Sequence, residues 1–242
     1  QLRLAEMYSR GNGVEENNVQ AIFWYREAAE QGNAMAFNAI DKMVKQGNTH
    51  ALNILSEMAK AGNDGAQKII IEMAEQGHME AQFQLGGMYA TGQGVALDFQ
   101  QAVTWYSKAA EQGDAGAQNN LGMMYDTGKG VPQDFKQAIF WYRKAAEQGY
   151  TAAQCHLADS YAWSDEHDYD KAFAWFSRAA EKNSAYAMFC LGAMYEHGNG
   201  READYEQAKT WYEKAVQREQ PDAAYNLGWM YENGEGMPQD YV

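Results

Sequence analysis

Cys155 and His156 are the residues whose types first suggest catalysis, because a thiol beside an imidazole is the pairing of a cysteine nucleophile and its base. The two residues are adjacent in a segment with helical periodicity, where neighbours point about 100° apart. We therefore expect the two side chains not to face each other. The sequence predicts no catalytic residue, and we expect the protein not to be an enzyme.

An acidic cluster lies further along the chain. Its carboxylate oxygens could bind a cation. A shortened polar turn that ends in a helix N-cap explains the same residues, and we favour this second interpretation. The cluster comprises Asp165, Glu166, His167, Asp168 and Asp170.

Two other features resemble ligand sites but do not predict them. The five histidines lie in different parts of the chain, and none is at a two-ligand spacing from another. Gly-x-Gly segments resemble phosphate loops, but they follow predicted helices rather than strands and lack a third glycine. We therefore predict no metal site, no cofactor and no phosphate site.

The composition favours a folded helical protein. The 242 residues are 46% hydrophobic, enough to bury a core, and include three prolines. The net charge of -14 repels phosphate backbones, so we expect no nucleic-acid partner. No apolar run approaches the roughly 20 residues that span a bilayer, so we expect no membrane span. Because the sequence starts and stops within a repeat, we expect it to be part of a longer protein.

Internal repeats organise most of the chain. A motif of the form Leu-Gly-x-x-Tyr recurs at steps of 36, 36, 34 and 36 residues. In most copies it is followed by a Gly-x-Gly turn, an Asp, a Trp-Tyr or Trp-Phe pair and an Ala-rich end. The motif begins at Leu85, Leu121, Leu191 and Leu227; the copy at Leu157 has Ala in place of Gly, and a related copy begins at Leu4.

The repeat that contains Leu121 illustrates the physics of one unit. Gly122 beside Leu121 lets a neighbouring helix approach closely, and the Gly-x-Gly segment tolerates positive φ and ends the first helix. Asp134 is the expected N-cap of the second helix, which buries Trp141 and Tyr142. Neither helix can bury its apolar stripe alone, so each pair must stack on the next.

These elements closely resemble the Sel-one-like repeat family, a relative of the tetratricopeptide repeats, over residues 1–32 and 80–242. The resemblance implies an all-α fold, a right-handed α-solenoid of antiparallel helix pairs. Members scaffold complexes, often in bacterial envelopes, which favours a bacterial protein in the periplasm or outside the cell. Some members carry a disulfide in each repeat. Cys155 and Cys190 cannot supply that set, and we expect both to be free thiols.

The resemblance also implies a protein-interaction scaffold. The alternative is an envelope or secreted repeat protein that acts on the cell wall or regulates a cell-wall enzyme. We expect a monomer that binds a protein or peptide, for which the acidic charge favours a basic partner.

By analogy with tetratricopeptide arrays, the first helices line the concave face. Aromatic and Met side chains there are the usual anchors of interfaces, unless neighbouring repeats cover them. The predicted partner-binding residues are Phe83, Asn119, Met123, Asp159, Trp163, Phe189, Tyr225 and Trp229.

Residues 33–79 depart from this pattern, because Gln-Gly or Ala-Gly pairs recur there every 15 residues. Each segment is too short for a helix pair, so we predict three single helices. Their odd number should break the two-layer alternation and produce a bend or a change of polarity. The predicted helices span 34–45, 49–60 and 64–75, and the predicted domains are 1–32, 33–79 and 80–242.

Overall fold

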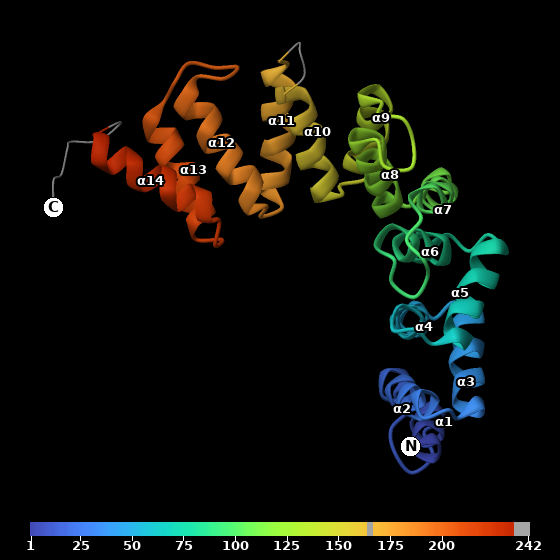
Figure 1. Ribbon diagram of the computed structural model, residues 1–242. Helices are drawn as coiled ribbons and strands as arrows, with labels where there is room; N and C mark the ends of the chain where they lie inside the picture. The colour runs from blue at the N-terminus through green and yellow to red at the C-terminus, as the bar shows by residue number, and fades with distance from the viewer. Residues whose placement is uncertain (164–166, 235–242) are drawn as a thin grey trace. The chain divides into compact units, whose positions relative to one another are not determined.

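The computed structural model describes residues 1–163 and 167–234, which form fourteen α-helices and no strand (Figure 1). The predicted all-α solenoid of helix pairs is confirmed. The helices are α1 (Leu2–Arg10), α2 (Asn18–Glu30), α3 (Ala34–Lys45), α4 (Thr49–Lys60), α5 (Asp64–Glu75), α6 (Met79–Thr91), α7 (Phe99–Glu111), α8 (Ala115–Thr127), α9 (Phe135–Glu147), α10 (Thr151–Trp163), α11 (Tyr169–Glu181), α12 (Ala185–His197), α13 (Tyr205–Val216) and α14 (Pro221–Asn233).

The chain forms two compact units. Unit 1 comprises residues 1–114 and 129–131, and unit 2 comprises residues 115–128 and 132–242. The boundary falls between two full repeats and not at residue 33 or 80, because it follows packing rather than repeat type. The division into 1–32, 33–79 and 80–242 describes repeat type and stays a prediction.

Local turn chemistry sets the helix ends. Asp98 and Asp134 each accept hydrogen bonds from the backbone N–H groups two and three residues further on, at 2.9 and 3.0 Å. Gly92 ends α6 with φ 70°, a left-handed conformation that glycine adopts without strain. The predicted caps are confirmed at these positions.

The shortened turn before α11 also ends in a cap. Asp168 accepts a hydrogen bond from the backbone N–H of Lys171 at 3.1 Å, and its other oxygen accepts from the Lys171 ammonium group. The interpretation of the acidic cluster as a polar turn with an N-cap is confirmed for Asp168. Asp165 and Glu166 lie outside the described residues.

One aromatic ring fills the space between the two helices of a pair. Leu121 and Tyr142 are each 1% exposed. A Cβ atom on Gly122 would lie 2.6 Å from Cδ1 of Tyr142, so the ring rests directly on the glycine. This contact explains why the motif pairs Leu-Gly with a tyrosine 20 residues later. The same contact joins Gly86 to Tyr106 and Gly192 to Tyr212.

The tryptophan of the Trp-Tyr pair does not share this position. Trp141 is half-buried, and the ammonium group of Lys144 lies 5.0 Å from its ring centre. Of the five tryptophans at this position, all in the described part of the chain, Trp105 alone is buried. The expectation that Trp141 is a core residue is therefore wrong. Trp141 directly precedes Tyr142 on the same helix, so its side chain points about 100° away from the buried tyrosine, toward the edge of the core.

Residues 33–79 form the three predicted single helices, α3, α4 and α5, with the predicted bounds. Asn33, Asn48 and Asn63 cap them by accepting from the third backbone N–H beyond, at 3.0, 3.0 and 2.9 Å. The glycine before each asparagine has positive φ and lets the chain reverse. These short-range interactions explain why the sequence predicted the bounds.

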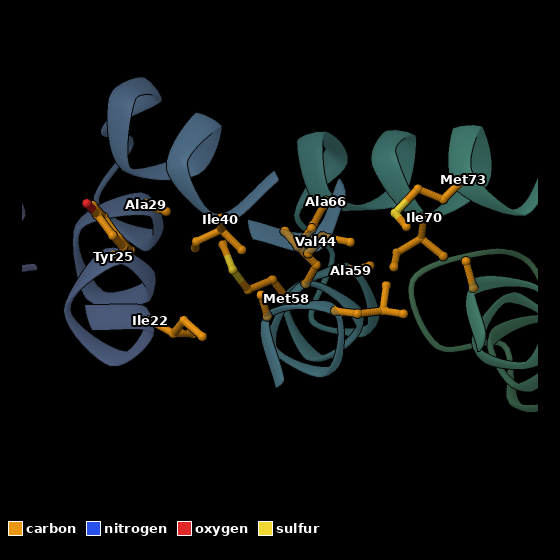
Figure 2. Packing of buried hydrophobic residues seen from close by; sticks show 14 of the residues in the cluster. Ile22, Tyr25, Ala29, Ile40, Val44, Met58, Ala59, Ala66, Ile70 and Met73 are labelled. Carbon is orange, nitrogen blue, oxygen red and sulfur yellow. The ribbon is translucent and has the colours of Figure 1, made fainter. Parts of the chain in front are cut away.

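The core of this segment repeats every 15 residues. Ile40, Leu55 and Ile70 are each completely buried. Figure 2 shows Ile40 and Ile70 pointing from the single helices into a continuous apolar cluster that also contains residues of α2. Met35, at the start of α3, stays outside this cluster and is 72% exposed.

The two layers of helices continue through the single helices of unit 1. Helix α4 contacts both α2 and α6, while α3 and α5 lie in the other layer (Figure 1). The expected break in the two-layer alternation is therefore wrong, because successive single helices lie in alternate layers. The expected change of polarity is present. Helix α2 is the second helix of its pair, yet it shares a layer with α6, the first helix of the next pair.

Unit 2 is built from full repeats. Helices α8/α9, α10/α11 and α12/α13 form pairs, and α9 packs on α10, α11 on α12 and α13 on α14. Side chains also link successive first helices. Asn119 on α8 contacts His156 on α10, and Tyr186 on α12 donates a hydrogen bond to Asp159 on α10.

Candidate partner-binding surface

Four of the predicted partner-binding residues are exposed apolar side chains on first helices of unit 2. Trp163 and Tyr225 are 79% and 75% exposed, and Met123 and Trp229 are each 42% exposed. Side chains of these types are the usual energetic anchors when a partner buries them. Their role in binding stays a prediction.

Two further predicted residues are partly committed to packing. Phe189 on α12 is half-buried, and its ring centre lies 5.9 Å from that of Tyr212. Phe83 is half-buried on α6 in unit 1, 6.0 Å from the ring of Tyr106. Each ring can offer a partner the part of its surface that its own repeat leaves uncovered.

Asn119 is placed differently from our expectation, because it is 4% exposed and cannot contact a partner directly. Its Oδ1 atom lies 2.9 Å from Nδ1 of His156. An amide oxygen only accepts hydrogen bonds, so Nδ1 carries the proton and Nε2 is the acceptor of the ring. Burial lowers the pKa of His156, which keeps the ring neutral at pH 7. Asn119 therefore sets the tautomer of His156.

Unit 2 contains a cavity of about 420 Å³ between α8, α9 and α10. This volume lies within the roughly 300–1,000 Å³ typical of ligand pockets. Aromatic and aliphatic groups form one part of its wall, and acidic and neutral polar groups form the rest. The lining residues are Phe135, Ile139, Trp163, Asp126, His156, Asp159 and Ser160.

From the sequence we placed Asp159 and Trp163 on this surface and missed the other lining residues. Asp126 and Asp159 are 33 residues apart, which is not the 36-residue step of the repeat, so alignment of the repeats did not bring them together. The available signal was that Asp126 directly follows a Leu-Gly-x-x-Tyr motif, at the end of a predicted first helix.

Asp159 is a half-buried carboxylate, and no lysine or arginine among residues 1–163 and 167–234 forms an ion pair with it. Burial raises its pKa to about 6, and the hydrogen bond from the Tyr186 hydroxyl, 2.9 Å long, opposes that rise. The negative charge of Asp126 raises the pKa further. The titratable groups around Asp159 are Asp126 on α8, Tyr142 on α9, Cys155 and His156 on α10, and Tyr186 and Cys190 on α12.

This pKa predicts an unusual pH dependence of stability. The folded chain binds a proton at Asp159 below about pH 6, whereas the unfolded chain binds it near the ordinary value of 3.8. The contribution of Asp159 to the free energy of unfolding therefore rises as the pH falls from about 6 to about 4. Asp159→Asn should stabilise the chain by about 1–2 kcal/mol at pH 7 and have little effect at pH 4.

Urea denaturation at pH 4, 5, 6 and 7 measures this difference. Asp222→Asn, at an exposed carboxylate on α14, is the matched control and should shift stability by less than about 0.5 kcal/mol. A stabilisation by Asp159→Asn that is equal at pH 4 and pH 7 would contradict the assigned pKa.

The geometry does not assemble the thiol and imidazole into a catalytic pair. Cys155 is buried with its sulfur 3.5 Å from Oγ of Ser184, whereas His156 contacts Asn119. Burial raises the pKa of the Cys155 thiol, which disfavours the reactive thiolate. Within residues 1–163 and 167–234 no three His, Cys, Asp or Glu side chains are placed to hold a metal ion. In the same residues no helix is both long and apolar enough to cross a bilayer.

The helix pairs stack on one another, and glycine–tyrosine contacts join the two helices of a pair. This arrangement defines an α-solenoid of the tetratricopeptide-like class, with aromatic groups exposed on its first helices. The chain belongs to the Sel1 repeat family. The family model matches six segments, with residues 34–79 left unmatched. The matched segments are 1–33, 80–114, 115–150, 151–184, 185–219 and 221–242.

Two solved structures are similar in both sequence and fold. One is c5321, a protective antigen of uropathogenic Escherichia coli strains with an SLR fold, at 32% identity and a TM-score of 0.71. The match covers 99% of this chain and 58% of that one, so the chain spans little more than half of that relative's length. The other is a Sel1 repeat protein from Oxalobacter formigenes, at 33% identity and a TM-score of 0.69, with 76% of this chain and 77% of that chain covered. No curated protein matches the sequence.

Proposed function

We propose that this protein is an interaction scaffold that holds a protein or peptide partner on the first helices of unit 2. Sel1 repeat solenoids in general are protein-interaction scaffolds rather than enzymes. The observation that carries the proposal is the exposure of Trp163, Tyr225 and Trp229 on these helices. Large aromatic side chains that keep this much surface exposed leave that surface free for a partner, and they are the residue types that dominate interface energies.

Charge supports a basic partner. The chain carries 33 acidic and 19 basic side chains, and two carboxylates, Asp126 and Asp159, line the cavity on this surface. An acidic surface attracts a basic partner and speeds its association at low ionic strength. The partner binds as a segment that contacts the aromatic groups while its positive charges face the carboxylates.

The variant Phe189→Ala/Tyr225→Ala/Trp229→Ala tests this proposal. We expect at least about 2 kcal/mol weaker binding, or about 30-fold, because truncated hot-spot side chains cost this much. Far-UV circular dichroism should show unchanged helicity. The partner is first captured with the intact chain, and its affinity is then measured by isothermal titration calorimetry.

The matched control is Phe140→Ala/Tyr205→Ala, which removes exposed aromatic groups from two second helices of the same unit. These side chains are 47% and 37% exposed. The control should bind the partner as the parent does. If the control loses affinity while the first-helix variant keeps it, the binding surface lies on the second helices and the proposal is wrong.

A further inference from the structure

We propose that the cavity between α8, α9 and α10 binds an arginine side chain of the partner. This inference rests on the proposed scaffold function and names the group that the surface recognises. It follows from three properties of the cavity: its hydrogen-bonding character, its charge and its aromatic rim.

The two carboxylates of the cavity, Asp126 and Asp159, each have acceptor positions left for a guest. The Tyr142 hydroxyl donates to Asp126 at 3.4 Å, and the Tyr186 hydroxyl donates to Asp159 at 2.9 Å. Each of these bonds uses one acceptor position, and a carboxylate has about four. No lysine or arginine in the described part of the chain forms an ion pair with either carboxylate.

The neutral polar groups of the cavity are acceptors as well. The Ser160 hydroxyl donates its proton to the backbone carbonyl of His156 at 2.8 Å, which leaves its oxygen lone pairs. His156 donates through Nδ1 to Asn119, which leaves Nε2 as an acceptor. The polar side chains around the cavity thus present acceptors on four residues, and a complementary guest must be rich in N–H donors and carry positive charge.

Arginine meets this requirement better than lysine. A guanidinium group carries five N–H donors in one plane, whereas the lysine ammonium is a compact, strongly hydrated charge. Trp163 is 79% exposed and Phe135 is 60% exposed at the cavity, and a planar guanidinium stacks on such rings. The side chain of Ile139 can contact the aliphatic part of the guest.

A short peptide with one central arginine between glycine and serine residues is the probe, with both ends blocked. Its citrulline counterpart has nearly the same shape but no charge, and a lysine counterpart keeps the charge without the planar fork. The indole N–H signal of Trp163 in ¹H–¹⁵N spectra of the full chain, identified by its loss in Trp163→Phe, reports binding. We expect the arginine peptide to shift this signal and to bind at least about tenfold more tightly than the citrulline peptide.

Two carboxylate variants complete the test. Asp159→Asn keeps the acceptor for Tyr186 but removes the charge, and it should lower the affinity for the arginine peptide by at least about tenfold. Asp222→Asn changes the net charge equally on exposed α14 and should leave the affinity within about twofold. Circular dichroism and urea denaturation verify that both variants fold.

Three results would overturn the inference. They are equal affinity for the arginine and citrulline peptides, equal loss in Asp159→Asn and Asp222→Asn, and no shift of the Trp163 signal at millimolar peptide. Failure of the scaffold proposal is detected by a different measurement, the affinity of the captured partner for the variant in which Phe189, Tyr225 and Trp229 are replaced by alanine. A partner that binds through those residues while the arginine peptide does not bind leaves the scaffold function in place and removes the arginine site.

Discussion

Tyr142→Ala should lower the free energy of unfolding by about 3–5 kcal/mol, the cost of truncating a fully buried aromatic side chain. The Tyr142 ring is 1% exposed and rests on Gly122, between the two helices of its pair. Its removal leaves a cavity that the helices can close only by moving toward each other. Because stability in repeat arrays passes between neighbours, protection should also fall in α10, which packs on α9.

Two variants separate this effect from its alternatives. Tyr142→Phe keeps the ring and loses a hydrogen bond of 3.4 Å to Asp126, so it should cost no more than about 1 kcal/mol. Phe176 already occupies the corresponding place in the next repeat, where it is 2% exposed. Trp141→Ala should cost less than about 2 kcal/mol, because its ring is only half-buried.

Urea denaturation followed by circular dichroism measures these differences, and hydrogen exchange of the α8, α9 and α10 amides locates them. A larger loss in Trp141→Ala than in Tyr142→Ala would show that the tryptophan, and not the tyrosine, holds the pair together.

Gly94→Ala should destabilise the chain by about 2–5 kcal/mol. Gly94 has φ +77°, and a Cβ atom there would lie 2.1 Å from the carbonyl oxygen of Ala59 at the end of α4. The left-handed conformation alone costs an alanine about 1–2 kcal/mol. The contact adds an overpacking cost of about 1–3 kcal/mol, because a backbone carbonyl in a helix cannot move aside as a flexible side chain can.

Gly13→Ala is the matched control. Gly13 is the second glycine of the same turn in the first repeat and has φ +78°, but its nearest neighbour would be Cε of Met7 at 3.6 Å. This variant should therefore cost only the conformational part, about 1–2 kcal/mol. Thermal or urea unfolding of both variants measures the difference. Equal losses would mean that the turn needs glycine for its conformation alone and that the approach of α4 is unimportant.

The sequence alone determined the features that depend on near neighbours along the chain. The repeat register, the fold class and the bounds of α3, α4 and α5 follow from apolar periodicity and from capping groups within a few residues. Asn48 is an example, because its side chain accepts from a backbone N–H only three residues further on. Such interactions are the same in every environment that permits a helix, so they can be predicted from the sequence without knowledge of the tertiary structure.

Only the tertiary structure decided how helices share space. Trp141 and Tyr142 are adjacent aromatic residues, and the bare sequence does not say which one faces Gly122, since that depends on how α8 and α9 cross. The layer shared by α2, α4 and α6 likewise depends on where each single helix packs, and not on its length or periodicity.

The candidate site depends still more on tertiary structure. Asp126 and Asp159 line one cavity although they occupy different positions in their repeats, because α10 packs beside the α8/α9 pair. Asn119 occupies a register position that we predicted to face solvent, yet it is buried against His156 of the next first helix. Exposure and electrostatics are set by atoms that lie far away in the sequence and close in space. For that reason the fold could be predicted here with its helix bounds, whereas the binding surface could be predicted only in outline.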